Sequence, residues 1–126
     1  MWRAVHGVDA RRLADEHDHI IFVCGRYEGI DERVEENIAD ESFSIGEYVL
    51  TGGELPALVM TDAIVRQIPG VLGNNETLHN ESYDEPGKMD FPQYTKPEEY
   101  NDWTVPDVLL SGNHAEIDKW REENRK

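Results

Sequence analysis

Two glycine-punctuated segments contain the residues of this chain whose types and spacing suit small-molecule chemistry. They read CGRYEGIDER over residues 24–33 and SIGEYVLTGGELPA over residues 44–57, and a short apolar run leads into each. Glycine lets a backbone approach a ligand closely and turn through positive φ. Because α/β sheets bind small molecules in loops at strand ends, the two segments predict one shared ligand pocket.

Other chemistries find less support in the sequence. The five histidines show no metal-ligand spacing, and the pair His17 and His19 lacks the partner that a structural site needs. The single cysteine, Cys24, ends an apolar run and is expected to be a buried small hydrophobe. The sequence therefore predicts no metal site and no cysteine nucleophile, and it contains no Walker A, GxGxxG or GxSxG motif.

The composition limits the class of protein. A chain of 126 residues is long enough for one domain with its own core, or for a small domain and a tail. Its formal net charge of -15 argues by itself against nucleic-acid binding, which needs clustered cations, and an acidic surface also fits adaptation to high salt. One cysteine, no apolar leader and no long apolar run predict a cytoplasmic protein without membrane segments.

Apolar periodicity and capping residues predict the elements that position the two glycine segments. The run HIIFVC over residues 19–24 predicts a buried parallel strand. The helix over residues 54–68 has Pro56 in its first turn and apolar residues over most of its surface, so we expect it to be largely buried. Other predicted elements are helices over residues 10–18 (N-cap Asp9), 30–38 and 114–125 (cap Ser111 or Asn113), and extended pieces over residues 43–45 and 48–50.

Five strings of the chain carry a resemblance to one family. They are VCGRYEGIDERV (residues 23–34), SIGEYVLTGGELPA (44–57), IPGVLGN (68–74), FPQYTKPE (91–98) and VPDVLLSGNHAEIDKWR (105–121). In this order and spacing they closely resemble the bacterial tRNA (guanine-N1-)-methyltransferases of the SPOUT class.

The resemblance implies an α/β fold: a SPOUT-type parallel sheet with a C-terminal trefoil knot, here incomplete, then a linker and part of a small helical domain. Residues 1–73 would be the C-terminal part of the cofactor-binding domain, residues 74–104 the inter-domain linker and residues 105–126 the start of the helical tRNA-binding domain. The family's longer N-terminal half and its extreme C-terminus are expected to be absent from this chain. The aromatics of the linker are expected to dock on a neighbour.

The resemblance also implies an activity. The family methylates N1 of the guanosine just 3′ of the tRNA anticodon, with S-adenosylmethionine as the methyl donor, and works as a homodimer; a requirement for Mg2+ follows only by analogy. N1 carries a proton, and neutral N1 is a poor nucleophile. The site therefore needs a carboxylate base, a cation for the charge that moves toward O6, and a rigid cofactor cradle.

By resemblance, backbone groups of the two glycine segments hold the cofactor. The matching positions are Gly25, Tyr27, Glu28, Ile45, Gly46, Glu47, Tyr48, Val49, Leu50, Gly52, Gly53 and Pro56. Glu28 is expected to hold the cofactor's ammonium or ribose hydroxyls, and Leu50 and Pro56 to shape the adenine slot. The alternative is that the glycines only make tight turns and that Glu28 is a solvated loop acid.

Two further positions match catalytic residues of the family. Arg66 would stabilise charge on the target base, although it also stands four residues after Asp62, where an ordinary ion pair could form. Glu81 stands where the family commonly has an aspartate base. Glutamate keeps the carboxylate of aspartate and adds one methylene. The second candidate for the base is Asp84. The alternative for Glu81 is that it is an ordinary acidic residue of a loop.

Three hypotheses about function follow from these residues. The first is a tRNA methyltransferase. The second is a catalytically inactive fragment that keeps the dimer surface and a weakened cofactor pocket. The third is an acidic dimer domain whose aromatic-rich linker captures a protein, which requires the linker aromatics to be exposed.

Overall fold

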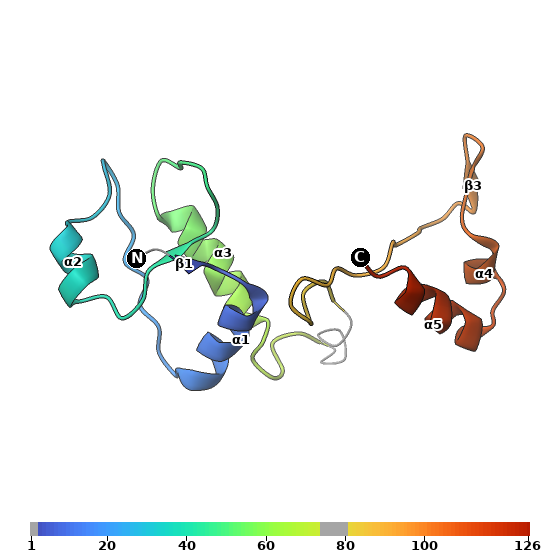
Figure 1. Ribbon diagram of the computed structural model, residues 1–126, viewed down its shortest axis with the longest axis horizontal. Helices are drawn as coiled ribbons and strands as arrows, with labels where there is room; N and C mark the ends of the chain where they lie inside the picture. The colour runs from blue at the N-terminus through green and yellow to red at the C-terminus, as the bar shows by residue number, and fades with distance from the viewer. Residues whose placement is uncertain (1–2, 74–80) are drawn as a thin grey trace. The chain divides into compact units, whose positions relative to one another are not determined.

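The computed structural model describes residues 3–73 and 81–126. It divides the chain into two compact units, Met1–Leu78 and His79–Lys126, and each unit is described by itself (Figure 1). The division falls in the stretch outside the described residues, where the predicted linker also begins. The predicted domain boundaries at residues 73 and 104 stay predictions.

The first unit is a mixed α/β structure around one pair of parallel strands. Arg3 of the first strand lies opposite Phe43 of the second, and Ala4 lies opposite Ser44. Parallel strands need a crossover connection, and here two helices lie between them in the sequence. The elements of this unit are β1 (Arg3–Ala4), α1 (Gly7–Glu16), α2 (Glu32–Asn37), β2 (Phe43–Ser44) and α3 (Glu54–Val65). The α/β class with a parallel pair is thus confirmed.

The core of the first unit lies between α1 and α3, which pack against each other (Figure 1). Its buried residues are Ala10 and Leu13 of α1 and Met60 and Ile64 of α3. Half-buried apolar side chains surround this cluster: Val5, Ala14, Ile20, Phe22, Phe43, Ile45 and Ala63. Because Phe22 and Ile45 are among them, the core anchors the chain near the start of both glycine segments.

The first turn of α1 is organised by His6 and not by the predicted cap. His6 is the N-cap, and its backbone N–H donates to the Asp9 carboxylate at 2.9 Å, which completes a capping box. The Asp9 carboxylate also accepts from Arg3 Nη2 at 2.7 Å and is almost fully buried. The prediction of Asp9 as N-cap is wrong, because Asp9 stabilises the helix from inside its first turn.

The predicted buried strand over residues 19–24 is also wrong. The segment forms no strand, and alternate side chains face solvent, with Ile21 76% and Val23 61% exposed. A strand needs a neighbour to bond its backbone groups, and in the described residues β1 and β2 pair with each other instead. Cys24 at the end of this segment is exposed, contrary to its expected burial.

The helix predicted over residues 54–68 is confirmed as α3, although it ends earlier. Its predicted burial holds for one face only. Met60 and Ile64 are buried against α1, while apolar side chains remain exposed elsewhere on the helix: Leu55 (59%), Leu58 (64%) and Val59 (52%). A helix that is apolar all round therefore finds a partner on only one side within this unit.

The second unit contains a short hairpin and two helices that pack together. Its elements are β3 (Glu99–Tyr100), β4 (Trp103–Thr104), α4 (Asp107–Leu110) and α5 (His114–Glu123). Asn113 caps α5, since its side chain accepts from the Glu116 backbone N–H; of the two predicted caps, Asn113 is confirmed. The hairpin lies within the predicted linker, and its aromatics Tyr100 and Trp103 are exposed.

Candidate functional site

The first glycine segment is a sharply turned loop that leads into α2. Tyr27, Glu28 and Gly29 have φ values of 51°, 72° and 101°, so three successive residues are left-handed. For Tyr and Glu this conformation is uncommon and persists only where the surroundings fix it. Asp31 then caps α2 by accepting from the Arg33 backbone N–H at 2.9 Å. The loop leaves Tyr27 94% exposed.

The second glycine segment begins at β2 and is turned by Ser44. The Ser44 hydroxyl accepts from the Gly46 N–H at 3.2 Å and donates to the Gly46 carbonyl at 3.1 Å. The Tyr48 hydroxyl donates to the Ile45 carbonyl at 3.4 Å. Beyond this turn the chain is exposed, and Val49 is 97% exposed. The segment thus offers apolar side chains on a loop whose backbone is held by polar contacts.

The two segments contact each other at their glycines. The Gly53 N–H donates to the Gly25 carbonyl at 3.0 Å, and Arg26 and Gly52 form an antiparallel bridge. The Arg26 Nε also donates to Glu54 Oε1 at 2.7 Å. A pair of backbone contacts and an ion pair therefore join the two segments into one continuous surface, which we call the glycine junction.

Gly25 and Gly53 stand where a side chain would not fit, and neither is needed for an unusual backbone conformation. A Cβ on Gly53 would lie 2.9 Å from the Cα of Cys24, and one on Gly25 would lie 2.7 Å from the Cγ1 of Ile30. Real Cβ atoms essentially never come within 3.0 Å of other heavy atoms. Neither glycine has a positive φ. At Gly53 only a residue without a side chain lets the two segments approach this closely, whereas the atoms nearest to a Cβ on Gly25 belong to Ile30 and Gly29 of the same segment.

The residues predicted to bind the cofactor fall into two groups, one half-buried and one exposed. The half-buried ones are Gly25, Ile45, Gly52, Gly53 and Pro56. The exposed ones are Tyr27, Glu28, Gly46, Glu47, Tyr48, Val49 and Leu50. The glycines of the junction are in the half-buried group, and the apolar and acidic side chains that could contact a ligand are in the exposed group.

The ion pair between Arg26 and Glu54 was missed by the sequence analysis. The signal was present, because opposite charges directly follow the glycines of the two segments, as GR in the first and GGE in the second. The hydrogen bond from Arg26, a bond from the backbone and the Arg26 charge together lower the pKa of Glu54 below its ordinary value. The carboxylate is therefore held ionised at the place where the two segments join.

We expect Glu54→Gln to weaken the junction in a pH-dependent way. Because the folded-state pKa of Glu54 is lowered, its contribution is present above the ordinary glutamate pKa of about 4.3 and is lost as the pH falls through the folded-state value. The side chains of Arg26 and Glu54 are 58% and 49% exposed, so the fall in melting temperature should be no more than a few degrees. Thermal unfolding from about pH 7 to about pH 3 measures it.

The matched control for this prediction is Glu36→Gln, on an exposed position of α2. Its melting temperature should follow that of the wild type at every pH. A difference between wild type and Glu54→Gln that stays constant down to the lowest pH would contradict the assigned role of the Arg26 pair.

Arg66 lies directly after α3, at the far end of that helix from the glycine junction. Its backbone N–H donates to the Asp62 carbonyl at 3.2 Å, and its side chain is half-buried. Since α3 has 12 residues, the helix separates Arg66 from Gly53 by about 18 Å. Within one copy of the chain, Arg66 is therefore not part of the glycine junction.

Glu81 and Asp84 lie in the second unit, where the Asp84 N–H donates to the Glu81 carbonyl at 3.2 Å. The Asp84 carboxylate accepts from Arg125 Nη2 and from the Glu85 N–H. Burial alone would raise the pKa of Asp84, but these hydrogen bonds and the charges of Arg125 and Lys88 outweigh it, and the pKa is lowered. An engaged carboxylate with a lowered pKa is a poor proton acceptor, which counts against Asp84 as the base.

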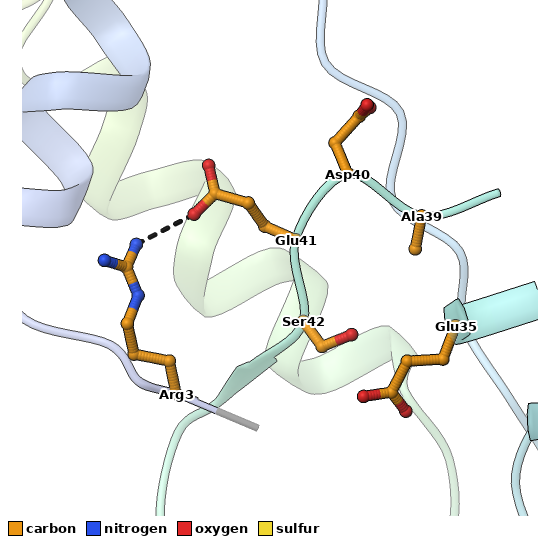
Figure 2. Close-up of a pocket in the computed structure, with 6 residues that line it drawn as sticks. All are labelled: Arg3, Glu35, Ala39, Asp40, Glu41 and Ser42. Carbon is orange, nitrogen blue, oxygen red and sulfur yellow. Dashed lines mark hydrogen bonds and ion pairs between the residues drawn. The ribbon is translucent and has the colours of Figure 1, made fainter. Parts of the chain in front are cut away.

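Two cavities are lined by residues other than the predicted site residues. One of about 270 Å³ in the first unit is shown in Figure 2, where Arg3 donates to Glu41 at 2.8 Å; it is lined by Arg3, Glu35, Ala39, Asp40, Glu41 and Ser42. The other, of about 280 Å³, lies in the second unit, and its lining includes Phe91, Tyr94, Ile117, Trp120 and Arg121. In this second cavity Tyr94 and Trp120 have ring centroids 6.3 Å apart.

Within residues 3–73 and 81–126, no group of three His, Cys, Asp or Glu side chains is arranged to hold a metal ion. None of the helices in these ranges has the length and apolar character needed to cross a bilayer.

Three bacterial relatives of this chain carry the same name. The family model of tRNA (guanine-1)-methyltransferase TrmD matches residues 3–126. The tRNA (guanine-N(1)-)-methyltransferase of Staphylococcus haemolyticus is 58% identical over 110 residues, which cover 87% of this chain and 44% of that protein. The enzymes of the same name from Staphylococcus carnosus and Staphylococcus aureus strain JH9 are each 59% identical to this chain over 108 residues. These residues cover 86% of this chain and 44% of each relative. The chain thus spans less than half the length of these relatives. It belongs to the tRNA (guanine-1)-methyltransferase family, TrmD.

Proposed function

We propose that the chain carries the cofactor loops and catalytic residues of a methyltransferase that uses S-adenosylmethionine to methylate N1 of the guanine just 3′ of a tRNA anticodon. The glycine junction is the observation that carries this proposal. Its bond between Gly53 and Gly25 and its ion pair between Arg26 and Glu54 join the two segments that match the family's cofactor loops. Membership of the family supports the reaction, and a cytoplasmic location would follow from it.

The residues around the junction fit S-adenosylmethionine, which when bound supplies a methyl group on a sulfonium. Exposed apolar side chains, Tyr48, Val49 and Leu50, suit the faces of an adenine ring. Exposed carboxylates, Glu28 and Glu47, suit the ribose hydroxyls and the ammonium of the cofactor's amino-acid part. A Mg2+ requirement remains a proposal by analogy with the family.

The chemistry assigned to this chain is proton removal and charge stabilisation. Glu81 would accept the N1 proton, and the Arg66 guanidinium would stabilise the charge that moves toward O6. The engagement of Asp84 with Arg125 favours Glu81 over this second candidate base. Arg66 lies about 18 Å along α3 from Gly53. We therefore propose that Arg66 acts together with the glycine junction of a second copy of the chain.

We therefore propose a homodimer of SPOUT type, with the family's trefoil knot. Apolar side chains on α3 and on residues 19–24 are exposed in the first unit, among them Leu58 (64%) and Ile21 (76%). Exposed apolar faces of this kind mark interaction surfaces. Sedimentation equilibrium should give a dimer for the wild type and a monomer for Leu58→Asp. The control is Tyr100→Asp, which replaces an exposed aromatic side chain of the second unit by the same acid and should leave the dimer intact. A monomeric wild type at tens of micromolar would contradict the proposal.

Methyl transfer tests the proposed function directly. The 126-residue chain is incubated with S-adenosylmethionine and an unmodified tRNA transcript, and the digested nucleosides are analysed by mass spectrometry. We expect 1-methylguanosine with the guanine-bearing transcript and none when adenine replaces the guanine 3′ of the anticodon. No product with either transcript would favour the inactive-fragment hypothesis.

A further inference from the structure

The stretch over residues 81–90, which contains the candidate base, forms a closed loop in the second unit. The Tyr83 N–H donates to the Lys88 carbonyl at 2.6 Å, and the Asp90 N–H donates to the Ser82 hydroxyl at 2.9 Å. These bonds connect the two ends of the stretch, which we call the 81–90 loop. These two hydrogen bonds within the loop fix its shape. Its position therefore depends on its contacts with the rest of the second unit.

The most buried attachment of the 81–90 loop is an ion pair with the residues that follow α5. Arg125 Nη2 donates to the Asp84 carboxylate, and the two side chains are only 7% and 17% exposed. The Nε of the same guanidinium is buried without a hydrogen-bond partner in the described residues. Arg125 is therefore held in a buried position by its bond to Asp84, and removal of either charge would cost the other a hydrogen-bonded partner of opposite charge.

The 81–90 loop makes two further contacts with α5 and the residues that follow it. Lys88 Nζ approaches Glu122 of α5 at 3.4 Å, but these side chains are 36% and 66% exposed, and exposed pairs contribute little. Met89 and Lys126 exchange backbone hydrogen bonds. Of the two ion pairs, the one between Asp84 and Arg125 is the more buried.

We propose that Arg125 is a positioning residue for Glu81. The connection is short: Arg125 holds the Asp84 carboxylate, and the Asp84 N–H in turn holds the Glu81 carbonyl at 3.2 Å. The inference rests on the proposed function, in which Glu81 is the base. Arg125, which follows α5, would thereby set the place of the base by acting through Asp84.

Amide hydrogen exchange of the whole 126-residue chain tests this inference without any need for turnover. In Arg125→Gln, the amides of Tyr83 and Asp84 should exchange at least about tenfold faster than in the wild type. Arg125→Lys, which keeps the charge, should give an intermediate rate. The control is Lys119→Gln, because Lys119 lies on α5 in an exposed pair with Glu123, and it should leave both amides unchanged.

The outcomes separate this inference from the proposed function. Unchanged exchange in Arg125→Gln, or equal loosening in Lys119→Gln, overturns it. Should Arg125→Gln unfold the second unit, Asp84→Asn gives the same comparison with less change in volume.

In methyl transfer, Arg125→Gln should lower kcat while the KM for S-adenosylmethionine stays the same. If exchange rises but Glu81→Gln keeps wild-type turnover, the loop attachment stands and the assignment of Glu81 as base fails.

Discussion

Gly53→Ala is expected to weaken the binding of S-adenosylmethionine by about 100-fold and to destabilise the first unit by about 1–3 kcal/mol. The added Cβ would lie 2.9 Å from the Cα and 3.1 Å from the Cβ of Cys24, and 3.2 Å from the backbone nitrogen of Gly25. Two of these atoms belong to the backbone, so no side-chain rotation relieves the overlap. The two glycine segments must separate, and the surface that we assign to the cofactor is lost. Calorimetric titration and thermal unfolding measure both effects.

The control for this prediction is Gly73→Ala in the same unit. Among the described residues, no atom lies within 4 Å of a Cβ there, and Gly73 has no positive φ, so neither binding nor stability should fall. If Gly53→Ala bound S-adenosylmethionine as tightly as the wild type, the glycine junction would not be the cofactor site.

Glu81→Gln is expected to reduce methyl transfer by about 10²–10⁴-fold, the usual contribution of a general base. The amide keeps the size of the side chain but cannot accept the N1 proton. Binding of S-adenosylmethionine should be unchanged, because the proposed base acts on the guanine and not on the cofactor. Single-turnover methylation of a tRNA transcript, with a separate binding titration, measures the two quantities.

Two variants control the Glu81 prediction. Glu99→Gln removes an exposed acid from β3 and should leave methylation unchanged. Asp84→Asn should cause a smaller loss than Glu81→Gln, since it loosens the 81–90 loop without removing the base. A fully active Glu81→Gln beside an inactive Asp84→Asn would transfer the role of base to Asp84.

Helices were predictable from this sequence because their signals are local. The helix that begins at Glu54, with Pro56 in its first turn, and the helix capped by Asn113 were both found from neighbouring residues alone. Their ends were predicted less well, since α3 stops at Val65 where the sequence pattern continues. Asp9 was misassigned because a capping box places its acid three residues after the cap, and His6 is an uncommon cap.

Features that depend on distant partners could not be predicted. HIIFVC has the composition of a buried strand, but whether it becomes one depends on a neighbouring strand, and in the described residues β1 and β2 pair with each other. The burial of Leu58 likewise depends on a partner for the outer face of α3. At the candidate site, the sequence indicated both glycine segments and the opposite charges that follow their glycines, but that Arg26 pairs with Glu54 depends on how the segments meet.

Calorimetric titration of the 126-residue chain with S-adenosylmethionine measures whether the two glycine segments form a cofactor cradle. We expect binding with a Kd near the micromolar range, which corresponds to about -8 kcal/mol. S-adenosylhomocysteine should compete for the same site. The absence of detectable binding by the folded chain would contradict the claim, and the glycine junction would then be a structural contact only.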